Sequence, residues 1–255
     1  MRKRRRTKVG KRKQPAMQCV LGNAAVLMLR TGLDISSSPM VRFLLRSFIL
    51  LIVLALAGFA YAVWPRQADL RRFDADAVAR LETSMWRNYY DHDDKSLVRN
   101  LYSLYRDVYH FSPADSAQLA YNAGTAAQLF QPTKSREEAQ VALPLLQRYY
   151  ALLRSHGGEK FDPEKAATLE LNWWQLRREN ATPEEYGKVI GQVAGEIFGV
   201  HNEHIDRSSL LRAQMMQYRD ERRTGLMQPE DWAHIEQQLA ESYRELKTGV
   251  APGMK

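Results

Sequence analysis

The chain has 255 residues, a single cysteine and a formal net charge of +8. The charge is segregated, because 12 of the 37 Lys and Arg residues precede residue 47, where one acidic residue, Asp34, opposes them. The other 25 basic and 28 acidic residues give the rest of the chain a charge of about −3, which argues against nucleic acid as its partner. The lone cysteine excludes an internal disulfide.

Residues 1–39 show neither helical nor strand periodicity and contain a basic block over 2–13. We interpret them either as a disordered basic segment or as an untranslated extension upstream of a start at Met40. If translated, the basic block alone could bind RNA or anionic lipid.

An uncharged apolar run, Ser47–Pro65, follows two arginines at positions 42 and 46. A helix of this length spans roughly 28 Å, close to the ~30 Å hydrocarbon core of a bilayer. We therefore predict a transmembrane signal-anchor over residues 40–65. The lipid bilayer is then one partner of the chain. The excess of Lys and Arg before the run predicts a cytoplasmic N-terminus and an extracytoplasmic domain over 66–255.

The same segment also has the parts of an export signal. Ala60 and Ala62 offer the small residues of a cleavage site after Ala62, which would release a secreted domain. We favour the uncut single-pass anchor, because the apolar run continues past that site and Tyr61 and Trp64 suit a membrane interface.

Residues 66–255 predict an all-α domain, an antiparallel bundle of about eight helices behind the transmembrane helix. The expected helices, in chain order, lie near 74–90, 95–109, 112–132, 135–157, 162–180, 182–199, 207–223 and from 229 onwards. Asp74, Ser112 and Thr182 are the expected N-caps of three of them, and Pro144 is expected to kink the fourth. No window matches two tetratricopeptide units in register, which favours a bundle over a repeat array.

The helix over 182–199 contains four glycines spaced by four residues. Each costs roughly 1 kcal/mol relative to Ala, so we expect another backbone to pack closely on them, with Gly191 and Gly195 buried. The first candidate is the helix over 112–132, whose small residues are Ala117, Ala120, Gly124 and Ala127. A self-association face, and hence a homo-oligomer, is the alternative. The glycines concerned are Gly187, Gly191, Gly195 and Gly199.

Polar and aromatic clusters give the candidate sites. His201, Glu203 and His204 follow the glycine helix, and His234 lies later; such residues could share a metal or a ligand, although a solvated loop is the alternative. Aromatic residues also occur side by side, as at Trp173 and Trp174. One interpretation is a platform for a sugar or peptide, and the other is packing between helix layers. The remaining aromatic groups are Trp86 with Tyr89 and Tyr90, and Tyr149 with Tyr150.

No catalytic, cofactor-binding or metal-binding motif stands out, so the sequence predicts neither a cofactor nor a metal. The abundant helical faces favour a membrane-anchored, non-enzymatic binding or scaffold module of a cell envelope, with another protein as its partner. The alternative is an envelope enzyme or ligand receptor with an aromatic-lined pocket and His and Glu groups.

Overall fold

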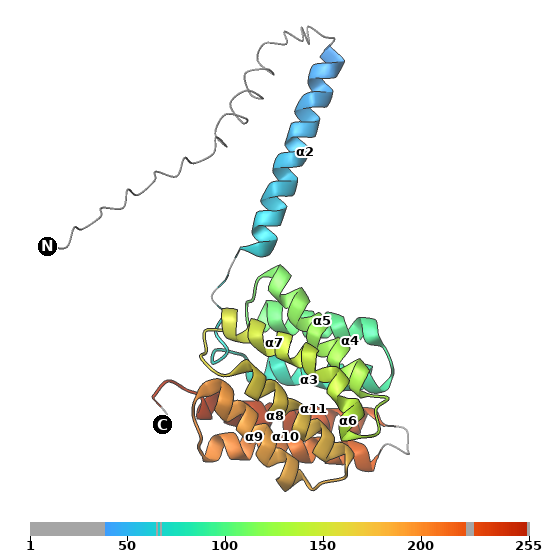
Figure 1. Cartoon of the computed structure of the whole chain (residues 1–255), viewed down its shortest axis with the longest axis vertical. Helices are drawn as coiled ribbons and strands as arrows, with labels where there is room; N and C mark the ends of the chain where they lie inside the picture. The colour runs from blue at the N-terminus through green and yellow to red at the C-terminus, as the bar shows by residue number, and fades with distance from the viewer. Residues whose placement is uncertain (1–38, 65, 67, 223–226, 254–255) are drawn as a thin grey trace, which may run out of the picture. The chain divides into compact units, whose positions relative to one another are not determined.

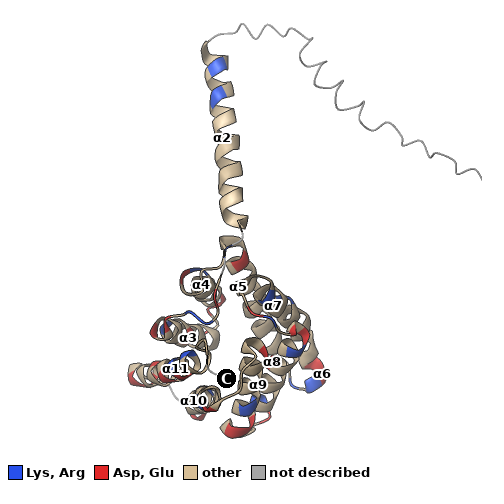
Figure 2. Cartoon of the chain, turned by 90° about the vertical axis from the view of Figure 1, so that its left-hand side faces the viewer, with Lys and Arg blue, Asp and Glu red and all other residues tan. Residues whose placement is uncertain are grey.

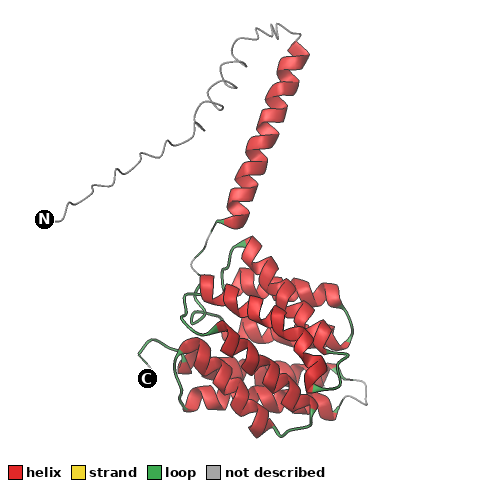
Figure 3. Cartoon of the chain, viewed as in Figure 1, coloured by secondary structure: helices red, strands yellow, loops and turns green. Residues whose placement is uncertain are grey.

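The computed structural model describes residues 39–64, 66, 68–222 and 227–253 (Figure 1). Within these residues the chain is helical and contains no strand, which confirms the all-α prediction (Figure 3). The expectation for the segment 1–39 lies, apart from its last residue, outside the described residues. Residues 1–56 and 57–255 form two compact units, which are considered separately.

Helix α2 (Pro39–Val63) is continuous over the segment in which the apolar helix was predicted. It has a mean hydropathy of 2.5 over its most apolar window, and none of its residues is buried. By length and composition this helix could cross a membrane.

The larger unit is built from helices joined by short connections. Their bounds are α3 (Ala75–Tyr90), α4 (Asp94–Ser103), the π-helix η1 (Leu104–Val108), α5 (Pro113–Phe130), α6 (Arg136–Ala139), the 3-10 helix η2 (Gln140–Ala142), α7 (Leu143–His156), α8 (Pro163–Arg178), α9 (Pro183–Phe198), α10 (Glu203–Glu221) and α11 (Pro229–Gly249).

The predicted N-caps are confirmed. Asp74 accepts hydrogen bonds from the backbone N–H groups of residues 76 and 77, at 3.0 and 3.1 Å. Ser112 accepts one from the N–H of Asp115 at 3.1 Å, and Thr182 forms a reciprocal capping box with Glu185. These side chains satisfy N–H groups that the first helical turn leaves without partners, which is why the helix starts could be predicted locally.

Two predicted helices differ from the structure. The helix expected over 135–157 is divided into α6, η2 and α7, and Pro144 lies in the first turn of α7 instead of kinking a longer helix. Proline is tolerated there because an N–H in the first turn needs no partner within the helix. The helix expected over 95–109 ends as a π-turn, in which the N–H of Tyr109 donates to the carbonyl of Leu104 at 3.2 Å.

Helices α3, α4, α5, α7, α8, α9, α10 and α11 form a closed ring (Figure 2). Each packs on the next in chain order, and α11 packs on α3 to close the circle. Short connections of this kind typically join helices that run in roughly opposite directions. This closure was not predicted, because it depends on contacts between the first and last helices of the domain.

Arg71 ties three distant segments together beside the ring. Its guanidinium pairs with both carboxylate oxygens of Glu159, at 2.6 and 2.9 Å. It also donates to the carbonyl of Phe198, the last residue of α9, at 2.6 Å. A further donor contacts the carbonyl of Val250, just past the end of α11, at 2.9 Å. These are carbonyls that a helix end leaves without intrahelical partners.

The glycines of α9 pack mainly on α10, so the prediction that α5 is their partner is wrong. A Cβ at Gly187 would lie 3.4 Å from both the Cα of Leu210 and the carbonyl oxygen of Ser209. Gly191 also faces Ser209. Gly187 and Gly191 are both buried, which confirms the expectation for Gly191. Gly195 is buried too, but the ring of His201 covers it.

Gly199 ends α9 in the left-handed conformation, with φ of +65°. Of the small residues expected to face α9, Gly124 on α5 faces α4 instead, since a Cβ there would meet Val98 and Leu101, and Ala117 is exposed.

Candidate site: a cavity inside the helix ring

A cavity of about 370 Å³ lies inside the ring, and every helix of the ring contributes to its wall. This volume is within the range of small-molecule pockets. The space exists partly because α5 and α9 present Ala123, Ala127 and Ala194, where larger side chains would fill it. The aromatic residues of the wall are Trp86, Tyr89, Tyr105, Tyr109, Phe130, Tyr149, Tyr150, Trp173, Trp174, Phe198 and Tyr243.

The π-turn η1 contributes to this wall. Leu104 and Tyr105 are buried at its start, and both line the cavity together with Tyr109 just beyond its end. An inserted residue of this kind changes the direction of the side chains that follow, and π-turns are frequent at functional sites.

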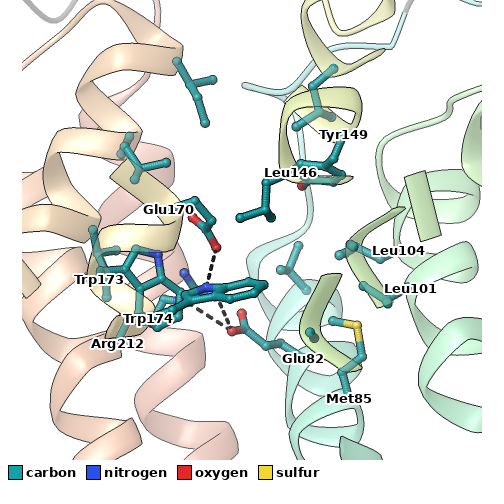
Figure 4. A pocket seen from close by; sticks show the side chains of 18 of the residues that line it. Glu82, Met85, Leu101, Leu104, Leu146, Tyr149, Glu170, Trp173, Trp174 and Arg212 are labelled. Atoms are coloured by element: carbon teal, nitrogen blue, oxygen red, sulfur yellow. Dashed lines mark hydrogen bonds and ion pairs between the residues drawn. The ribbon is translucent and has the colours of Figure 1, made fainter. Parts of the chain in front are cut away.

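Glu82 of α3 is the polar centre of the cavity wall and is 5 % exposed (Figure 4). One of its oxygens accepts from Arg212 Nη2 and Nε, at 2.7 and 3.0 Å, and from Trp86 Nε1 at 3.1 Å. The other accepts from the hydroxyl of Tyr243 on α11. Four donors from three helices therefore neutralise and fix this carboxylate, as a buried charge requires.

Glu170 of α8 is the second carboxylate of the wall. It accepts hydrogen bonds from the Tyr150 hydroxyl at 2.9 Å and from Trp174 Nε1 at 3.0 Å. The Trp174 ring reaches into the pocket on the same side as this carboxylate (Figure 4). The two carboxylates thus accept hydrogen bonds from indole N–H and tyrosine O–H groups. Without them these groups would lie in an apolar wall without an acceptor.

Arg177 lies at the edge of the cavity and stacks over the Trp86 ring, with 5.1 Å between Cζ and the ring centroid. Its Nε and Nη2 pair with the two carboxylate oxygens of Asp220, at 2.9 and 2.8 Å, and Nη2 also contacts the Tyr90 hydroxyl at 2.5 Å. Two paired cations, Arg177 and Arg212, therefore contact tryptophan rings of the wall.

Burial fixes the protonation of these groups. It raises the pKa of Tyr149 to about 12 and raises the pKa of Tyr105 and Tyr243 well above 10, so all three keep their hydroxyl protons at neutral pH. Burial alone would lower the pKa of Arg212, but Glu82, Tyr243 and Glu170 together outweigh it and raise the pKa above its ordinary value. Arg212 therefore stays charged.

The structure places only part of the predicted candidate site in the cavity. Trp173 and Trp174 line it, whereas the predicted polar residues do not. His204 pairs with Glu245 at 2.7 Å, and the His234 ring packs at a tilt against the Tyr218 ring, with 4.4 Å between ring centroids. The polar residues that lie outside the cavity wall are His201, Glu203, His204 and His234.

Of the sequence 201–204, His201 lies in the connection between α9 and α10, as the loop alternative predicted, and the rest begins α10. Asn202 is the N-cap of α10 and accepts from the N–H of Ile205 at 3.1 Å, so Glu203 and His204 belong to the first turn of that helix. Within the described part of the chain, no three His, Cys, Asp or Glu side chains are grouped so as to hold a metal ion.

Sequence reasoning missed Glu82, Glu170 and Arg212. A signal for one of them was present: Glu82 lies four residues after Val78 on the apolar face of α3. A charged residue at a core position of a helix indicates a buried partner. Which partner it meets could not be read from sequence, since residues 82 and 212 are brought together only by ring closure.

Comparison of the chain with protein-family models, with curated proteins and with solved structures found no match. The functional argument therefore rests on the geometry of the cavity.

Proposed function

We propose that the helical domain is a non-enzymatic binding module that holds a small, mainly apolar molecule inside its ring of helices. The observation that carries this proposal is the cavity of about 370 Å³, whose wall is aromatic and aliphatic except for a few fixed polar groups. Concave apolar sites with a few oriented polar groups are typical of small-molecule binding. The cavity thus favours the ligand receptor, the alternative function predicted from sequence, over a scaffold for another protein.

The hydrogen bonds of the two carboxylates favour binding over catalysis. Glu82 accepts from four donors and Glu170 from two. To act as a general base, either carboxylate would have to give up hydrogen bonds that now hold its oxygens.

We also propose that α2 anchors the module in a membrane, with the N-terminus cytoplasmic and the domain outside the cytoplasm. The length and hydropathy of α2 and the excess of Lys and Arg before it support this orientation. Protease added to spheroplasts should then degrade the domain, and its protection would contradict the orientation.

The binding proposal can be tested on the full chain in lipid nanodiscs, using the apolar fluorescent probe N-phenylnaphthylamine. The variant Ala194→Phe should fill the cavity and abolish the probe fluorescence that exceeds lipid partitioning, and Ala123→Phe should do the same from α5. Ala233→Phe places the same ring on the exposed face of α11 and should bind the probe like the wild type. Equal fluorescence from all four proteins would refute the cavity as a binding site.

A further inference from the structure

Glu170 differs from the other charged groups of the cavity wall because it has no ionic partner among the described residues. Glu82 pairs with Arg212 at 2.7 Å. Arg177, the other cation of the wall, pairs with Asp220 at 2.8 Å. The hydrogen bonds that Glu170 accepts from described residues come from two neutral donors. The pairing of the other charges therefore leaves one negative charge of the wall without a cation.

The Glu170 carboxylate can be reached from the cavity. The residue is half-buried and lines the cavity, and Figure 4 shows its carboxylate pointing from α8 into this space, beside the Trp174 ring. The two oxygens of a carboxylate offer about four acceptor positions. Tyr150 and Trp174 occupy two of them, so a bound molecule can still contact these oxygens.

The aromatic ring beside this carboxylate also has no cation over it in the described part of the chain. Arginine guanidinium groups lie over the other two tryptophan rings of the wall, those of Trp86 and Trp173. An ammonium group is attracted to the face of an aromatic ring, and tryptophan attracts it most strongly. Trp174 and Glu170 thus place an aromatic ring and a negative charge next to each other, and both face the cavity.

The charge of a bound molecule decides whether Glu170 gains a partner. A neutral molecule that fills the cavity would displace water from this carboxylate and leave its charge uncompensated, which is unfavourable. An anion would add the repulsion between like charges. An organic cation would instead replace the lost hydration of Glu170 with an ionic contact, while its apolar part packs on the aliphatic and aromatic wall.

We propose that the ligand of the cavity is a mainly apolar molecule with one ammonium group, which contacts the Glu170 carboxylate and the Trp174 ring. This inference rests on the proposed binding function and specifies its ligand class. The apolar part of the molecule occupies the rest of the cavity.

Three probes with the same alkyl chain test the ligand class: decyltrimethylammonium, decanol and decanoate. Each is titrated below its micelle or solubility limit against the full chain in nanodiscs of zwitterionic lipid, and displacement of N-phenylnaphthylamine is measured against Ala194→Phe in the same lipid. We expect decyltrimethylammonium to bind at least about tenfold more tightly than either of the other probes. A smaller preference, or a bound dye that no probe displaces, would overturn the inference and leave the binding function intact. Dye fluorescence no greater than that of Ala194→Phe would overturn both.

The role of the carboxylate charge is tested with Glu170→Gln, which removes the charge and keeps the length of the side chain. The affinity for decyltrimethylammonium should fall about tenfold and the affinity for decanol should not fall, so that the preference for the cation is lost. Glu164→Gln, on an exposed residue of the same helix outside the cavity wall, is the matched control and should keep the preference. An unchanged preference in Glu170→Gln would contradict the assignment, since a purely structural role would weaken the binding of both probes equally. The ranking of the three probes on the wild-type chain stands independently if Glu170→Gln does not fold.

Discussion

Removing Glu82 should destabilise the domain more than any exposed charge change. In Glu82→Leu the guanidinium of Arg212, with 26 % of its side chain exposed, loses its ion-pair partner, and Trp86 and Tyr243 lose their acceptor. Breaking a buried ion pair from one side costs about 3–5 kcal/mol. For a domain of this size, 1 kcal/mol corresponds to about 2–4 °C in Tm, so the expected decrease is about 10 °C.

Removing Arg212 as well shows whether the loss of stability in Glu82→Leu arises from the guanidinium left without its ion-pair partner. Arg212→Met should also lower Tm, but the double variant Glu82→Leu/Arg212→Met should regain much of the loss, because it leaves no unpaired charge. Thermal unfolding of the full chain in nanodiscs, followed by circular dichroism, measures all three. Glu179→Leu, which breaks the exposed pair with Arg136, is the control and should shift Tm by less than about 4 °C. Additive single effects, or a Glu82→Leu change as small as the control, would refute the reasoning.

Three further changes test the packing of α9 on α10, the hydrogen bonds of Arg71 and the ion pair of Glu196. Gly187→Leu should lower stability by about 1–3 kcal/mol in a thermal unfolding experiment, because the added side chain meets the backbone of α10. Arg71→Met should lower Tm by several degrees, since it leaves Glu159 and two helix-end carbonyls without their donor. Lys165 and a backbone N–H hold the pKa of Glu196 below its ordinary value of 4.5, so its stabilisation exists above that pH and is lost as the pH falls. The Tm of Glu196→Gln should therefore fall less steeply than the wild-type Tm between about pH 6 and pH 3.

Each of these changes has a matched control in the same fold. Gly195→Ala should cost little, because the exposed ring of His201 can move away from the new methyl group. Arg72→Met removes a guanidinium whose side chain is 86 % exposed and should leave Tm unchanged. Glu164→Gln, on an exposed residue, should preserve the wild-type pH curve. A variant that behaves like its control would contradict the contact assigned to it.

Local features of this fold could be predicted from sequence, and long-range features could not. The N-caps at Asp74, Ser112 and Thr182 were predicted because a side chain and its N–H partner are two or three residues apart. The partner of the α9 glycines was wrong because small residues recur on several helices, and only the tertiary packing selects α10. Closure of the ring by α3 and α11 brings together residues more than 150 positions apart, as in the Tyr243–Glu82 hydrogen bond.

The same difference between local and long-range features applies to the candidate site. The adjacent pair Trp173 and Trp174 was noticed because two neighbouring aromatic rings on a helix cannot face one core in the same way. In the structure both residues form part of the cavity wall, and the indole N–H of Trp174 donates a hydrogen bond to Glu170. The histidines at positions 201 and 204 attracted attention by their spacing, but the start of α10 places them outside the cavity wall.

The central claim is that the ring of helices holds a small, mainly apolar molecule, and native mass spectrometry of the intact chain released from its own membranes tests it most directly. We expect the wild-type chain and Ala233→Phe to carry the same small-molecule adduct, and Ala194→Phe to lack it. A wild-type chain without an adduct, or an equal adduct on Ala194→Phe, would contradict the account.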